Sequence, residues 1–270
     1  MAFFKQFPKV DYDFRNSGTT QKMTDIYRSI RVLPNFLDQI SGYKFYEIVN
    51  GERPDIVSQR LYGSSQYYWT FFVVNDFLHD GYRAWPMSQE ALQEYIAKQY
   101  EGYVITTNPV LIHNSDGLVT GINDSIVGKF KLGETITGTD SGATGTLTKK
   151  NIDMNQLVIQ NVTGAFIGNP TLIQNTTEQI TGSQSSDIVS TYQAFKYADA
   201  PYYYYNENDV DKKPVTNAIF IPGGTPESDL AYQTYRDYEF ELNESRSKIR
   251  YIDPNYIEQF VNDYEELLNE

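Results

Sequence analysis

Apolar residues in the first hundred positions change from strand-like to helix-like spacing. Residues 46–49 form a short β-type run, and the Asn50–Gly51 step after it is typical of a tight turn. Apolar side chains then recur every three or four positions, behind residue types that favour the start of a helix. This spacing predicts three helices, at residues 54–63, 65–75 and 88–100.

Local signals define the boundaries of these helices. Pro54 suits a first helical turn, and Gly63 can end that helix in the left-handed conformation. Ser65 and Ser88 are the expected N-caps of the other two helices, and Asn75 is the expected end of the second. We therefore expect an N-terminal arm and an α+β domain over residues 1–105.

The pattern changes over residues 106–190, which are rich in Gly, Thr, Ser, Asn and β-branched residues. Short apolar runs, such as residues 156–159, lie between turn formers, and no helical period is present. Two stretches, 130–138 and 166–173, look related and suggest a weak internal repeat. These features predict a small β-rich module inserted between helical regions.

Residues 191–270 are expected to end in a helix that returns to the first domain. Asp253 and Pro254 suit an N-cap and first turn, and an apolar stripe follows them. Before them, the tyrosine run 202–205 and the Pro/Gly-rich stretch 221–226 read as an irregular segment packed by its rings. The predicted fold class is therefore α+β, with an inserted β-rich module and a C-terminal amphipathic helix.

Composition narrows the choice of partners. A net charge of −13, from 35 acidic and 22 basic residues, disfavours nucleic acid and anionic membrane surfaces. There is no secretory signal at the start and no apolar run of membrane-spanning length, so a soluble protein is expected. The 23 Tyr and 15 Phe indicate either protein contact surfaces or an aromatic core, and composition leaves both open.

The sequence offers no clear chemistry. The absence of cysteine excludes disulfides, thiolate metal sites and a cysteine nucleophile. His79 has Asp76 and Asp80 nearby, but metal sites usually take three or four ligands, so a loop histidine is expected. No carboxylate pair stands out as an acid/base couple, because neighbours such as Glu265 and Glu266 do not share a helix face. We expect no catalytic residue, no cofactor and no metal.

A resemblance to a known family adds a specific expectation. The order of the strand and first two helices resembles a LysM module, a small peptidoglycan-binding fold. Together with residues 23–26, 62–63, 67–69, 75 and 85–86, it resembles the baseplate wedge protein fifty-three family of contractile-tailed bacteriophages. The likeness covers roughly residues 20–100 and 230–270.

The β-rich middle has no counterpart in the shorter family members. Its Gly133–Gly138 and Ser141–Gly145 segments are similar to modules of other virion proteins. We therefore expect it to be an insertion that adds a contact surface.

The family resemblance implies a structural protein of the virion tail baseplate, assembled in the host cytoplasm. It implies about six copies that join neighbouring wedges around the central hub. The implied partners are other baseplate wedge proteins, hub and tube-initiating proteins, and sheath-proximal wedge proteins. Two alternatives remain: a LysM-type peptidoglycan-binding module and, ranked last, a tail glycosidase.

The candidate contact residues are aromatic side chains beyond what one small helix pair can bury, a type that suits permanent interfaces. Trp69, Phe72 and Val73 are expected in the core instead, and Tyr67, Phe71 and Phe77 could serve either role. The candidate protein contacts are Tyr67, Tyr68, Phe71, Phe77, Tyr82, Trp85, Phe260 and Tyr264.

Overall fold

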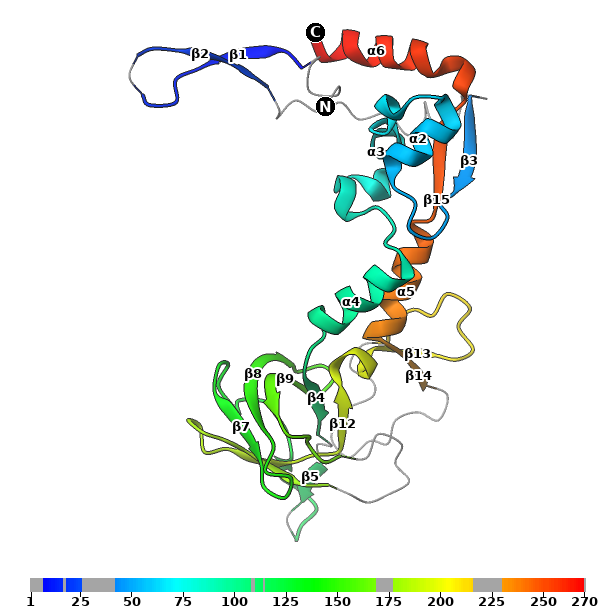
Figure 1. The fold of residues 1–270 in the computed structure, drawn as a ribbon. Helices are drawn as coiled ribbons and strands as arrows, with labels where there is room; N and C mark the ends of the chain where they lie inside the picture. The colour runs from blue at the N-terminus through cyan, green and yellow to red at the C-terminus, as the bar shows by residue number, and fades with distance from the viewer. Residues whose placement is uncertain are drawn as a thin grey trace. The chain divides into compact units, whose positions relative to one another are not determined.

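The chain forms two compact units in the computed structural model shown in Figure 1. The first unit comprises Met1–Leu92 and Glu241–Glu270, and the second comprises Gln93–Phe240. The residues that the structure describes are 7–16, 18–25, 42–107, 110–113, 115–168, 177–215 and 230–269. The mixture of helices and sheets confirms the α+β class. No helix among these residues has both the length and the apolar character needed to cross a bilayer.

The first unit is built on two strands from distant parts of the sequence. Strand β3 (Tyr43–Glu47) pairs antiparallel with β15 (Lys248–Ile252). One face of this pair packs on helices α2 (Pro54–Tyr62) and α3 (Thr70–Val74). The buried core contains Ile48, Val57, Phe71, Leu78, Ala84, Trp85 and Ile249.

The predicted strand at 46–49 begins three residues earlier than expected. Lys44 interrupts the apolar run, which hides the start of the strand, but pairing with β15 begins at Tyr43↔Ile252. The outer edge of β15 is closed by Asn75, whose side chain donates to the Arg250 carbonyl (2.9 Å) and accepts from the Arg250 N–H (2.8 Å).

Helix α2 has the predicted ends. Pro54 occupies its first turn, and Gly63 closes it at φ +72° with its N–H donating to the Gln59 carbonyl (3.0 Å). Helix α4 (Gln89–Gln99) also begins as predicted, since the Ser88 hydroxyl accepts from the Ala91 N–H (3.2 Å).

The single helix predicted at 65–75 is wrong. It is a 3-10 turn, Ser65–Tyr67, followed by the short helix α3, and Ser64 rather than Ser65 is the N-cap. The Thr70 hydroxyl donates to the Tyr67 carbonyl (2.8 Å), which competes with the regular helical hydrogen bonds at this point. Asn75 ends α3 as predicted.

Described residues from the N-terminal and C-terminal parts of the sequence pack together within the first unit, where Phe7 shares a cluster with Tyr264 and Leu268. A hairpin of β1 (Lys9–Tyr12) and β2 (Gln21–Thr24) follows the buried Phe7. Helix α6 (Ile257–Asn269) begins after a 3-10 turn capped by Asp253, which accepts from the Asn255 N–H (3.0 Å).

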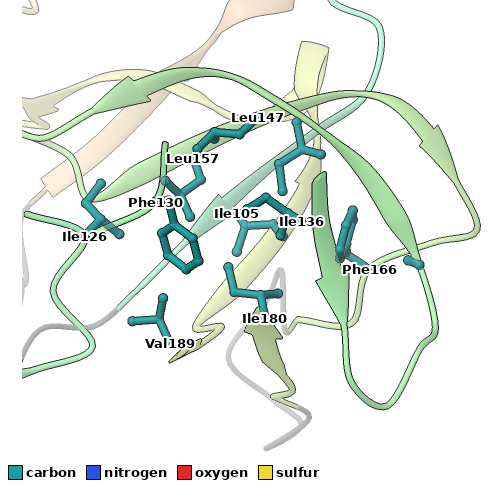
Figure 2. Packing of buried hydrophobic residues seen from close by; sticks show 11 residues of the cluster. Ile105, Ile126, Phe130, Ile136, Leu147, Leu157, Phe166, Ile180 and Val189 are labelled. Atoms are coloured by element: carbon teal, nitrogen blue, oxygen red, sulfur yellow. The ribbon is translucent and has the colours of Figure 1, made fainter. Parts of the chain in front are cut away.

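The second unit is centred on a curled, seven-stranded antiparallel sheet with the order β11-β10-β7-β8-β9-β4-β12. Its edge strands β11 and β12 are joined by only Thr191 and Tyr192, whose N–H groups donate to the carbonyls of Glu178 and Thr106. One bent segment therefore pairs with both sides of the sheet and closes it around a core (Figure 2). The strands are β4 (Tyr103–Thr106), β7 (Thr135–Gly138), β8 (Thr144–Asn151), β9 (Gln156–Thr163), β10 (Gln179–Gly182), β11 (Ile188–Ser190) and β12 (Gln193–Lys196).

The β-rich character predicted for residues 106–190 is confirmed, since the described residues of this range contain strands and no helix. A hairpin of β5 (Val110–His113) and β6 (Val119–Asn123) lies outside the main sheet.

The tyrosine run predicted to be irregular is a strand. Residues 202–205 lie in β13 (Pro201–Asn206), which pairs antiparallel with β14 (Leu230–Thr234) before helix α5 (Tyr235–Ser245). Four consecutive tyrosines mask the alternation that identifies a strand, and the partner strand is distant in sequence. The Pro/Gly-rich stretch 221–226 lies outside the described residues.

The internal repeat consists of different segments from those predicted. Residues 134–146 and 178–190 share the pattern Glu-x-Ile-Thr-Gly-x-x-Ser and form equivalent hairpins, with Ile136↔Gly145 matching Ile180↔Val189. The expected second copy, 166–173, precedes this pattern and lies partly outside the described residues. The shared glutamate and serine positions identify the repeat in the sequence. The sequence alone does not show that the two glutamates are buried.

The two repeats exchange buried carboxylates. Glu134 accepts from the N–H groups of Gln184 and Ser185 (both 2.9 Å), in the turn of the second repeat. Glu178 accepts from the Ser141 N–H (2.9 Å) and hydroxyl (3.0 Å), in the turn of the first. Both glutamates are buried. We call this reciprocal arrangement of Glu134 and Glu178 the glutamate clasp.

Candidate contact surface of the first unit

The eight candidate contact residues differ in their exposure. Phe77 and Tyr82 are exposed, at 42% and 60% of their surface. Tyr67, Tyr68 and Phe260 are partly buried. Phe71, Trp85 and Tyr264 are buried within the chain. The last three can therefore affect a contact surface by positioning other side chains, but they do not form one in this conformation.

One group of rings runs from the core to the surface. The Phe72 ring packs edge-on against buried Trp85, with centroids 5.8 Å apart. Tyr82 lies 5.5 Å from Phe72 and 5.9 Å from Tyr68. Exposed Tyr82 is therefore held by a supported aromatic layer, which reduces the entropy lost on binding a partner.

A second group of rings attaches α6 to the segment around α3. Trp69 lies 4.9 Å from Tyr264, and Phe260 lies 6.2 Å from Tyr264. Phe7 and Leu268 complete the buried cluster. The prediction that Trp69 is a core residue is confirmed, because only 5% of its surface is exposed. Phe72 and Val73 are partly buried.

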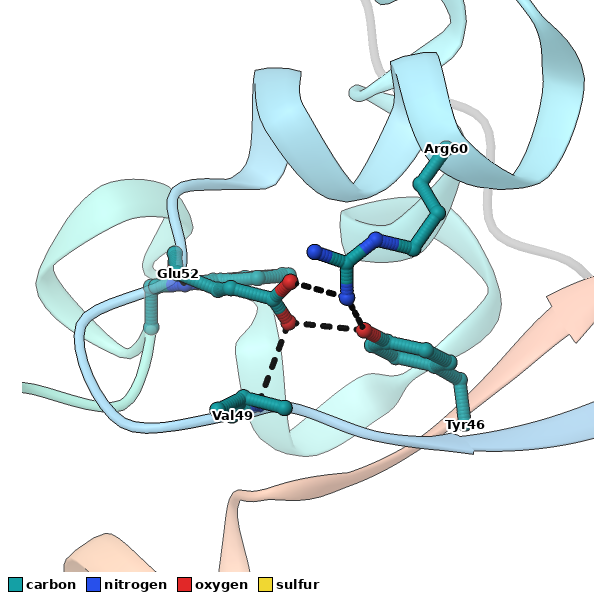
Figure 3. A network of polar contacts seen from close by, with 5 residues as sticks. Tyr46, Val49, Glu52 and Arg60 are labelled. Carbon is teal, nitrogen blue, oxygen red and sulfur yellow. Dashed lines mark hydrogen bonds and ion pairs between the residues drawn. The ribbon is translucent and has the colours of Figure 1, made fainter.

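Glu52 organises a polar network beside this core (Figure 3). Its carboxylate accepts from the Tyr46 hydroxyl (2.7 Å) and the Val49 N–H (3.1 Å), and it forms an ion pair with Arg60. Arg60 also donates to the Tyr46 hydroxyl (2.6 Å), while the Glu52 carbonyl accepts from the Trp85 indole N–H (2.7 Å). The network therefore joins the turn after β3 to α2 and to the aromatic layer.

Burial and the hydrogen bond to Glu52 raise the pKa of Tyr46 above its usual value. Sequence reasoning missed Glu52 because a charged residue in a turn normally indicates a solvated position. Its one sequence signal is its place directly after the Asn50–Gly51 turn, where a carboxylate can cap free N–H groups.

The two histidines show no assembled site. His79 contacts the Asp76 carbonyl through Nδ1 (2.9 Å) and the Asp80 carboxylate through Nε2 (3.2 Å). The side chain of His113 is outside the described part of the structure. Within the described ranges, no group of three or more His, Asp or Glu residues is placed to hold a metal ion.

Comparisons with known proteins match the N-terminal part of the chain. Residues 1–117 match the family described as Base plate wedge protein 53. The chain is also 30% identical over 103 residues to the baseplate wedge protein gp53 of Enterobacteria phage T4, which covers 36% of this chain and 51% of that protein. The match thus spans about half the length of the relative. Residues 1–117 are therefore similar to the base plate wedge protein 53 family, the family that the aromatic and glycine positions of this region resemble.

Proposed function

We propose that this protein is a structural component of a phage tail baseplate wedge and acts through assembly contacts rather than catalysis. The observation that carries the proposal is the family match over residues 1–117, a range that includes the Met1–Leu92 part of the first unit. In the virion, it would join neighbouring wedges around the central hub, in six copies, after assembly in the host cytoplasm. Its partners would be wedge proteins, including sheath-proximal ones, and hub and tube-initiating proteins.

The exposed aromatic residues supply the proposed contact surface. Exposed Phe77 and Tyr82 and partly buried Tyr67 and Tyr68 present rings of the type enriched in interfaces, and Tyr68 lies 5.9 Å from Tyr82. Buried Phe71 and Trp85 would hold this surface in place, and Phe260 and Tyr264 would hold α6. The surface would then be rigid before the partner arrives.

The proposed domain organisation follows the sequence. Residues 1–105 would form the arm and a LysM-like wedge domain, 106–190 an inserted module with its own contact surface, and 191–270 a segment returning to the wedge domain. The order β3, α2, α3, β15, a strand, two helices and a strand, supports the LysM-like part.

The same order favours peptidoglycan binding as a second candidate function. A pull-down on purified cell-wall sacculi tests it, and retention of the chain would support it. Lysis of peptidoglycan by the purified chain would instead support the glycosidase alternative.

The assembly role is tested by size-exclusion chromatography with light scattering. The purified chain is measured alone and then with the other wedge proteins of its baseplate, and we expect a shift into a larger complex. Tyr82→Ala should weaken the complex by about tenfold or more, the effect of losing an interface aromatic. Tyr95→Ala, which removes a 37% exposed tyrosine from α4, is the control. A wild-type chain that ignores every wedge protein would refute the role.

A further inference from the structure

The two edges of the β3–β15 sheet differ in their hydrogen bonding. At the β15 edge, the side chain of Asn75 bonds both the N–H and the carbonyl of Arg250. Arg250 faces Phe45 in the antiparallel register. Opposite residues in such a pair point their backbone groups either toward each other or both away. The backbone groups of Phe45 therefore point away from β15, toward the open edge of β3.

The rest of the register agrees with this orientation. Ile48 N–H donates to the Ser247 carbonyl (2.9 Å) and Asp253 N–H to the Gly42 carbonyl (2.5 Å), so these positions face β15. Backbone N–H and C=O groups of successive residues point to alternate sides of a strand, so those of Tyr43, Phe45 and Glu47 point outward, away from β15. In the described part of the chain, nothing donates to or accepts from these outward groups. The edge is a template for one more strand.

Side chains beside this edge add charge selectivity. Phe45 is 63% exposed, and the Lys248 ammonium lies 5.4 Å and the Arg250 guanidinium 6.0 Å from the centre of its ring. These cation–π contacts hold two positive groups over β3, although the chain as a whole carries a charge of −13. A strand added beside Phe45 would meet these cations with its own side chains, so carboxylates are favoured there.

We propose that β3 accepts an extended, carboxylate-bearing segment of a neighbouring baseplate protein as a third strand. Main-chain hydrogen bonds to Phe45 and Glu47 would supply affinity, and Lys248 and Arg250 would select acidic side chains. The inference rests on the proposed assembly role and assigns one of its contacts to a particular edge.

The first test uses a substitution that removes one outward N–H. Glu47→Pro deletes this donor and leaves the β3–β15 hydrogen bonds intact, because proline is tolerated where the N–H faces away from the sheet. Glu47→Ala removes the same carboxylate but keeps the N–H. We expect Glu47→Pro to bind the purified wedge proteins about tenfold or more weakly than Glu47→Ala. Unchanged tryptophan fluorescence would show that both variants keep the fold of the first unit.

The second test uses charge and needs no backbone change. The double variant Lys248→Glu/Arg250→Glu should lose about tenfold or more in affinity at low salt, with a smaller loss at high salt. Arg83→Glu/Lys98→Glu changes the net charge equally at exposed positions elsewhere and should bind like the wild type.

Amide hydrogen exchange of the full chain, alone and in the complex, gives a direct readout. Protection of the peptide containing Phe45 and Glu47 only in the complex supports the inference. A complex that forms without that protection, or that tolerates Glu47→Pro, overturns the inference and leaves the assembly role standing. Failure of the wild type to form any complex overturns both. If this protection instead increases with the concentration of the chain alone, the added strand comes from a second copy of the chain, which would contradict the proposal.

Discussion

Two buried glutamates show how single residues shape the second unit. Each carboxylate of the glutamate clasp is held by N–H and hydroxyl donors from the opposite repeat. Gly138 makes room for one of them, because a Cβ at this position would lie 2.5 Å from Glu178 Oε2. The Glu and Gly positions of the repeat therefore depend on each other.

Removing one clasp carboxylate should destabilise the second unit. Glu134→Ala leaves the N–H groups of Lys131, Gln184 and Ser185 without their acceptor in a buried place. We expect the free energy of unfolding to fall by about 3 kcal/mol, measured by urea denaturation. Glu101→Ala removes an exposed carboxylate from the same unit and should change it by less than about 0.5 kcal/mol. Equal effects would contradict the role of the clasp.

The glutamate clasp also predicts that the stability of the second unit depends on pH. Burial acts to raise the pKa of Glu134, but the N–H groups of Ser185, Gln184 and Lys131 hold this pKa below its usual value. A carboxyl with a lowered folded pKa stabilises the fold above its unfolded pKa, about 4.3, and this contribution is lost as pH falls through the folded pKa. Unfolding measured between pH 7 and pH 3 should show a steeper loss in the wild type than in Glu134→Gln. Parallel profiles would exclude this linkage.

At the scale of elements, helix α6 is held by one face. Leu268 is 1% exposed in the cluster with Phe7 and Trp69, whereas the adjacent Leu267 is 53% exposed. Leu268→Ala should cost about 2–5 kcal/mol because it leaves a cavity between α6 and Trp69. Leu267→Ala makes the same chemical change on the open face and should cost less than about 0.5 kcal/mol. Thermal unfolding followed by tryptophan fluorescence measures both, and similar losses would show that α6 does not pack this way.

At the scale of the whole molecule, the two units have separate cores. Both tryptophans, Trp69 and Trp85, lie in the first unit, so tryptophan fluorescence follows that unit alone. Calorimetry should resolve two unfolding transitions. Leu268→Ala should lower only the transition seen by fluorescence, Glu134→Ala only the other, and the double variant should be additive. A single transition shifted by both variants would contradict two independent cores.

The sequence by itself determined the features that depend on near neighbours. Pro54 and Gly63 define α2, Ser88 starts α4, and the β-branched composition of 106–190 predicts strands, because caps, turns and periodicity act over a few residues. The resemblance to the base plate wedge protein 53 family was also readable, since the aromatic and glycine positions that carry it lie within residues 1–117.

Only the tertiary structure decided which distant segments meet. The pairing of β3 with β15, the strand at 202–205 and the exchange of Glu134 and Glu178 between repeats all join residues far apart in sequence. The exposure that separates Tyr82 from Phe71 among the candidate contacts was decided in the same way. The sequence does not distinguish a buried glutamate from a solvated one. The role of a buried glutamate depends on the hydrogen-bond donors that folding brings around its carboxylate.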